Sequence, residues 1–213
     1  MTSVRTPTAE HLLLTAERLL AEKGLGAVST REIAREAGQK NHSAISYHFG
    51  SMASLIDAIL DYRMQSLDER RAALLSAATE QGETPEIRDL VEIMVKPFGE
   101  ELLQPLEQHH YISLLSQLIG RGEWQSLFTQ ERRSGALLQA GELLLNPLAA
   151  QLGEEIALER LRMMGLHILS TVAQWDAMHR RGEIELDESG LAWRINNLVD
   201  YLVGALCAHC SGN

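Results

Sequence analysis

The sequence predicts an all-α fold, in which an N-terminal three-helix helix-turn-helix domain precedes a larger helical domain, with about nine helices in all. Three observations support this prediction. Apolar residues recur at helical spacing along nearly the whole chain of 213 residues. No segment shows the sustained alternation with β-branched residues that is typical of a strand. Residues that start and stop helices bracket the apolar stretches.

The first two helices have clear start and stop signals. Thr6 is the expected N-cap of the first, and Pro7 the first helical residue, where a missing N–H costs nothing. Gly24 ends this helix. Ser29 and Glu32 have the spacing of a capping box and are expected to start a short second helix.

Gly38 is expected to end the second helix in a left-handed turn, and a third short helix is predicted over residues 43–49. Ser51 is the expected cap of a long fourth helix that reaches about Ala78. A loop at 81–85 follows. The remaining helices are predicted over 85–103, 106–119, 132–152, 154–180 and 189–209.

Composition limits the class of protein. The net charge is −10, but residues 1–60 contain six basic and six acidic side chains, so the whole excess lies in residues 61–213. A neutral N-terminal region on an acidic body remains compatible with DNA binding. No apolar run approaches the ~18 residues of a membrane span, and the N-terminus lacks a signal-peptide pattern. A cytoplasmic location is therefore expected.

Enzyme motifs are missing from the sequence: there is no G-x-S-x-G, no phosphate-binding loop and no H-E-x-x-H. The chain is therefore predicted not to be an enzyme, and no cofactor is expected. Cys207, His209 and Cys210 have zinc-binding side chains. A structural site needs four ligands, however, and no second cluster matches, so the end of an apolar helix is the favoured interpretation and no metal is predicted.

Two short segments, 30–38 and 44–51, carry the strongest functional signal. They form two short helices joined by a turn that begins with Gly38, with Ile33, Ile45 and Phe49 filling the space beneath. This geometry presents the N-terminal side chains of the third helix to solvent, where they can reach the edges of bases.

These segments resemble the TetR/AcrR family of bacterial transcriptional regulators. The pattern I-A-x-x-A-G occurs at residues 33–38 and Y-H-F-G-S at residues 47–51. Met52 stands where the family often has Lys, which removes one expected phosphate contact. The resemblance implies a DNA-binding domain over 1–50 and a helical ligand-binding and dimerisation domain over 51–213.

The resemblance also implies a function. It favours a homodimer that binds double-stranded operator DNA as a sequence-specific repressor and leaves it when a small effector binds, and the Met, Leu and Trp content indicates that this effector is largely apolar. Two alternatives in the same class are a ligand-independent DNA-binding regulator and an activator. A third, from another class, is a helical enzyme or carrier that binds a small molecule.

The resemblance also implies which residues contact DNA, some of them at phosphates and others at bases. The residues expected at the DNA are Thr30, Arg31, Lys40, Asn41, His42, Ser43, Tyr47 and His48. Large apolar side chains are candidates for an effector pocket, although each one alone is more typical of plain core: Met64, Leu67, Met94, Phe98, Tyr111, Trp124, Phe128 and Trp175.

The last two predicted helices are apolar around most of their girth. From residues alone, they are equally consistent with a central core in a monomer and with a helix pair that packs on a second subunit. The family resemblance favours the second subunit. The residues expected at this interface are Leu161, Ile168, Val172, Leu198 and Leu202.

Overall fold

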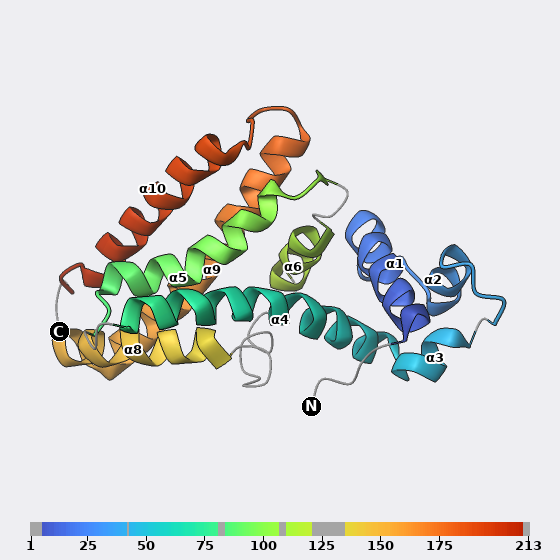
Figure 1. Cartoon of the computed structure of the whole chain (residues 1–213), viewed down its shortest axis with the longest axis horizontal. Coiled ribbons are helices and arrows are strands. Elements are labelled where there is room, and N and C mark those ends of the chain that lie inside the picture. The colour runs from blue at the N-terminus through green and yellow to red at the C-terminus, as the bar shows by residue number, and fades with distance from the viewer. Residues whose placement is uncertain (1–5, 42, 81–83, 107–109, 121–134, 211–213) are drawn as a thin grey trace. The chain divides into compact units, whose positions relative to one another are not determined.

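A computed structural model describes residues 6–41, 43–80, 84–106, 110–120 and 135–210 of the chain (Figure 1). These residues contain nine α-helices and one 3-10 helix, and no strand. The all-α prediction is therefore confirmed. Within the same residues, no helix combines the length and the apolar character that crossing a membrane requires.

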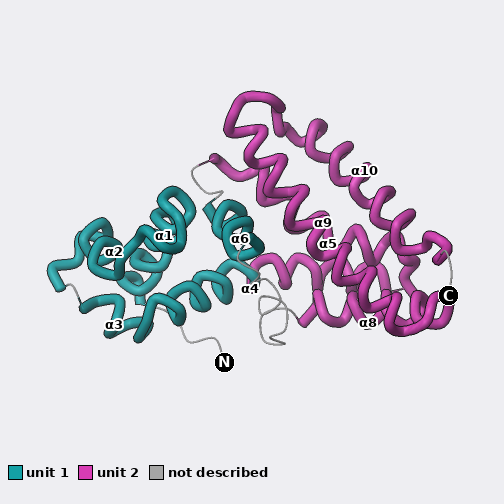
Figure 2. Tube along the Cα trace, turned by 180° about the vertical axis from the view of Figure 1, so that it is seen from behind, with its two compact units in different colours: residues 1–64, 110–127 teal, residues 65–109, 128–213 magenta. Residues whose placement is uncertain are grey.

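The chain divides into two compact units, coloured separately in Figure 2. Unit 1 comprises Met1–Met64 and His110–Leu127, and unit 2 comprises Gln65–His109 and Phe128–Asn213. The chain therefore passes between the units three times, and the long helix after Ser51 is not their only covalent connection, contrary to what the linear sequence suggests. The predicted boundary at residue 50 separates two functional domains, not two compact units, and it stays a prediction.

Unit 1 begins with the helices that the capping residues predicted. Helix α1 is Pro7–Lys23, and the Thr6 side chain accepts a hydrogen bond from the N–H of Ala9. Gly24 follows with φ of 98°, a conformation in which a side chain would be strained. The expected start and end of this helix are therefore confirmed, because both depend on local backbone hydrogen bonds.

Four further helices contribute to unit 1: α2 (Thr30–Glu36), α3 (Ala44–Phe49), the first part of α4 (Met52–Thr79) and α6 (His110–Gly120). Helix α6 packs on α1, although some ninety residues separate them in sequence. The core of the unit consists of fully buried side chains from α1 and these four helices, including Leu12, Leu13, Leu20, Ile33, Ile45, Leu55, Ile59 and Leu114.

Unit 2 contains the rest of α4 with α5 (Ile87–Gly99), the 3-10 helix η1 (Glu100–Leu103), α8 (Gly135–Leu152), α9 (Glu154–Arg180) and α10 (Glu188–Cys207). Helix α5 packs on α8 and α10, and α9 packs on α8 and α10. Gly99 allows α5 and α10 to approach closely, because a Cβ there would lie 3.0 Å from Cδ1 of Ile195.

Helix ends in unit 2 differ from the expected bounds where side-chain caps decide them. The helix expected from residue 85 begins at Ile87, since Glu86 and Asp89 form a reciprocal capping box. Helix α10 begins one residue before the predicted start, because the Asp187 side chain accepts the N–H of Gly190. It ends at Cys207, before the predicted residue 209, since Ala208 is extended.

Two of the other three predicted helices have parts outside the described residues. The helix over 106–119 appears as α6, whose described part begins at His110. The helix over 132–152 is described from Gly135. The helix over 154–180 is confirmed in full as α9.

Candidate nucleic-acid interface

The turn between α2 and α3 positions the candidate interface. Gly38 has φ of 67°, and this left-handed residue lets the N–H of Gln39 donate to the carbonyl of Ala34 at 2.9 Å. Ala34 is completely buried, as is Ile45 on α3. The small residues thus bring the two helices together, and the opposite side of α3 faces solvent.

The exposed side of this motif carries polar side chains that are available to a ligand. Arg31, Lys40 and Ser43 are exposed, and Thr30 is half-buried. Arg31 and Lys40 have no hydrogen-bond or ion-pair partner among the residues that the structure describes. Either cation could therefore bind a phosphate or a base without breaking a contact to another described residue.

Tyr47 and His48 occupy the outer surface of α3. The Tyr47 side chain is 83% exposed, an unusual environment for a large aromatic residue that has no binding partner. Its ring lies 4.9 Å from the half-buried His48 ring in an edge-to-face arrangement. The two side chains expected at phosphates therefore lie next to each other on the outer surface of α3.

Asn41 has a structural role that the sequence prediction missed. Its Oδ1 accepts the N–H of Ser43 at 2.9 Å, and its carbonyl accepts the N–H of Ala44 at 3.1 Å. Asn41 therefore shapes the start of α3, in addition to its predicted place at the bases. The preference of asparagine for such turns was the available signal. His42, predicted beside it, lies outside the described residues.

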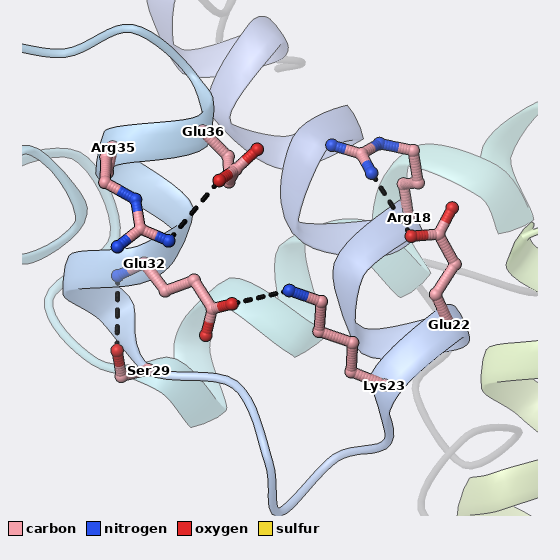
Figure 3. A network of polar contacts seen from close by, with 7 residues as sticks. All are labelled: Arg18, Glu22, Lys23, Ser29, Glu32, Arg35 and Glu36. Atoms are coloured by element: carbon pink, nitrogen blue, oxygen red, sulfur yellow. Dashed lines mark hydrogen bonds and ion pairs between the residues drawn. The ribbon is translucent and has the colours of Figure 1, made fainter.

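A polar network ties α1 to α2 (Figure 3). The Ser29 hydroxyl accepts the N–H of Glu32, which is the first half of the predicted capping box. The Glu32 carboxylate instead accepts a hydrogen bond from Lys23 Nζ at 2.7 Å. The hydrogen bond from this lysine lowers the pKa of Glu32, so protonating the carboxylate takes a lower pH than for an unpaired glutamate.

Arg31 is the cation of α2 whose charge is least compensated. Arg35 forms an ion pair with Glu36 at 3.4 Å, and Glu32 is neutralised by Lys23. An open cleft of about 550 Å³ is lined by Ser29, Arg31, Glu32 and Arg35. This part of the surface therefore presents positive charge beside the start of α2, where an anionic backbone would be attracted.

The side chains predicted for an effector pocket are distributed over both units. Met64 and Tyr111 are buried in unit 1, whereas Leu67, Met94 and Phe98 are buried in unit 2. Trp175 is half-buried in unit 2. Trp124 and Phe128 lie outside the described residues. Their role in an effector pocket stays a prediction.

The side chains predicted for a subunit interface are mostly enclosed within the chain itself. Ile168, Val172, Leu198 and Leu202 are buried in unit 2, and Leu161 is half-buried. The exposed apolar side chains of the same two helices are others: Leu158 and Met163 on α9, and Trp193 and Tyr201 on α10. Sequence periodicity did not distinguish the two sets, because both helices are apolar on more than one side.

The Cys207-His209-Cys210 cluster does not form a metal site in the described residues, where no three His, Cys, Asp or Glu side chains gather as one would require. Both cysteines are free thiols of intermediate exposure. Arg160 Nη1 donates to the carbonyls of Leu206 and Ala208, at 2.6 and 2.5 Å, and thereby closes this end of α10.

Taken together, the helix-turn-helix and its exposed cations define a DNA-binding protein. Residues 12–59 match the family model of bacterial regulatory proteins, tetR family. The resemblance to the TetR family is therefore confirmed, and the chain has the fold of a TetR-family transcriptional regulator.

Solved structures extend the similarity of fold to nearly the whole chain. The fatty acid degradation regulator FadR from Bacillus halodurans has a TM-score of 0.67 at 16% identity, covering 97% of this chain and 100% of that one. A protein from Rhodococcus sp. assigned to the TetR-family transcriptional regulators has a TM-score of 0.55 at 14% identity, covering 94% and 97% of the two chains. No curated protein sequence matches this chain.

Proposed function

We propose that the protein is a homodimeric, sequence-specific repressor that leaves its operator when a small, largely apolar molecule binds the helical domain over 51–213, and that it is not an enzyme. Within this proposal, DNA binding is supported by the exposed side of α2 and α3. There Arg31, Lys40 and Tyr47 extend into solvent, from a scaffold that matches the family's DNA-binding domain.

The proposed contacts fall into two groups. Thr30, Tyr47 and His48 are assigned to phosphates, which fix the position of the protein on the duplex. Lys40, Asn41, His42 and Ser43 are assigned to base edges at the start of α3, and Arg31 to either a phosphate or a guanine. Because the acidic excess lies in residues 61–213, it need not face the phosphates.

The operator is tested by selecting bound fragments from random double-stranded DNA with the purified chain. We expect an inverted repeat, because a two-fold protein imposes two-fold symmetry on its site. Affinity should fall steeply with salt, since each phosphate contact releases a counterion. Failure to enrich any fragment would refute sequence-specific binding, and an enriched site without symmetry would refute the dimer.

The effector is tested on the same enriched fragment with a panel of apolar compounds. A true effector should weaken operator binding, and saturating operator must weaken effector binding by the same factor. Equal effector affinities with and without operator would contradict release by an effector. If no compound acts, the ligand-independent regulator becomes the better description. Increased transcription from a promoter next to the operator would favour an activator.

Helix α4 is the proposed path from effector to DNA. In unit 2, the Asp68 carboxylate accepts the N–H groups of Ala136 and Leu137 at the start of α8, both at 3.0 Å. In unit 1, Tyr62 donates to Glu10 at 2.8 Å. One helix thus makes directed contacts in both units, so a shift along it would reach α1.

The exposed apolar side chains of α9 and α10 support the proposed dimer. Met163 is 48% exposed, and Trp193 and Tyr201 are each 56% exposed. The Tyr201 ring lies 5.7 Å from the ring of His167 on α9, so the exposed surfaces of the two helices meet there. A pair of helices from each subunit would cover these side chains in a four-helix interface.

A Tyr201→Asp substitution should weaken the dimer by at least about tenfold, because a two-fold interface receives the change twice and buries two carboxylates. Sedimentation at micromolar concentration measures it. Leu138→Asp is the matched control, since Leu138 is also exposed but lies on α8. A wild-type monomer, or a Tyr201→Asp dimer as tight as the control, would contradict this interface.

A further inference from the structure

The connection between α1 and α2 is held by a side chain from a distant part of the chain. Gln117, on α6, donates through Nε2 to the carbonyls of Leu20 and Ala21, at 3.2 and 3.0 Å. Its Oε1 accepts the N–H of Leu25 at 3.1 Å. One amide group therefore bonds to three backbone groups more than ninety residues away.

Two of these backbone groups are carbonyls in the last turn of α1, and the third is an N–H in the turn that follows it. The last carbonyls of a helix lack intrahelical donors and are usually satisfied by local caps or by water. Here the Leu20 carbonyl also accepts the N–H of Gly24 at 3.0 Å, so the local cap is only part of the arrangement. Gln117 supplies the rest and orients the turn that leaves α1.

This turn sets the position of the DNA-contacting residues. Ser29, the N-cap of α2, comes four residues after Leu25 and directly precedes Thr30 and Arg31. The Lys23–Glu32 ion pair joins the last residue of α1 to the first turn of α2. A change in the turn would therefore displace the exposed cations relative to α1.

We infer that Gln117 is a positioning residue for operator recognition, through which α6 controls the placement of α2. The inference rests on operator binding by the helix-turn-helix and goes beyond it, because it assigns a role in recognition to a residue of α6, outside the helix-turn-helix.

Substitutions of Gln117 test the inference on the wild-type-enriched operator fragment and on a shuffled fragment of equal composition. Gln117→Met keeps the length of the side chain but removes all three hydrogen bonds. We expect about tenfold weaker operator binding, as the loss of hydrogen bonds worth roughly 1 kcal/mol each allows, with less than about twofold change on shuffled DNA. Gln117→Glu should be at least as impaired, because its carboxylate would face two carbonyl oxygens.

A control variant, a hydrogen-exchange measurement and a replacement variant complete the test. Gln139→Met is the matched control, since Gln139 is exposed on α8. Hydrogen exchange at the Leu25 amide reports whether the contact is lost. If Gln117→Glu fails to fold, Gln117→Asn replaces it, because it keeps the amide but is too short to reach.

Faster exchange at Leu25 with unchanged operator affinity would overturn the inference. Equal losses on operator and shuffled DNA, in parallel with the melting temperature, would also overturn it, because they would show a structural role only. Failure of the wild-type chain to enrich any fragment would instead refute operator binding itself.

Discussion

An Arg63→Met substitution should lower the free energy of unfolding by about 3 kcal/mol, because it removes the arginine that is paired with a buried carboxylate. Glu17 lies in the middle of α1 and is 1% exposed. Both of its oxygens accept hydrogen bonds from Nε of Arg63 on α4, at 3.1 and 3.0 Å. The Arg63 side chain is 24% exposed, which places the expected loss at the lower end of the range for buried pairs.

Denaturant unfolding measures this loss, and two further variants interpret it. Arg18→Met is the matched control, since the Arg18–Glu22 pair is exposed and should contribute less than about 0.5 kcal/mol. The double variant with Glu17→Leu should recover much of the stability, because an apolar pair removes the buried charge as well. Equal losses in Arg63→Met and Arg18→Met would show that Glu17 does not depend on Arg63.

Arg31→Ala should weaken operator binding by about 1–3 kcal/mol, which is roughly five- to 150-fold in Kd. Arg31 is exposed, and its charge is not compensated by any partner in the described part of unit 1, so its interaction with DNA has no internal competitor. Titration of the enriched fragment at several salt concentrations measures the loss and assigns its cause. A uniform loss with a smaller salt slope indicates a phosphate contact, and relaxed specificity at one position indicates a base contact.

Arg35→Ala is the control for this experiment. Arg35 is exposed on the same helix but is paired with Glu36, so its loss should have a much smaller effect. If the two variants bind operator equally well, the uncompensated charge of Arg31 is not what the DNA recognises, and the orientation proposed for α2 on DNA is wrong.

Local signals in the sequence were sufficient to predict the helix-turn-helix. Thr6 and Ser29 cap α1 and α2 as expected, Gly24 ends α1, and Gly38 has the positive φ that was predicted for it. Each of these features depends on residues no more than five apart. Their hydrogen bonds form wherever the chain adopts the local backbone geometry, so single residue types predict them.

Tertiary structure decided which surfaces the later helices expose and what holds the DNA-binding helices in place. The apolar residues of α9 and α10 look alike in sequence, yet packing buries Leu198 and leaves Tyr201 in solvent. The bonds from Gln117 to α1, and from Arg63 to Glu17, join residues 46 to 97 positions apart. Nothing in the local sequence marks such partners, because they come together only when the helices pack and desolvate their polar groups.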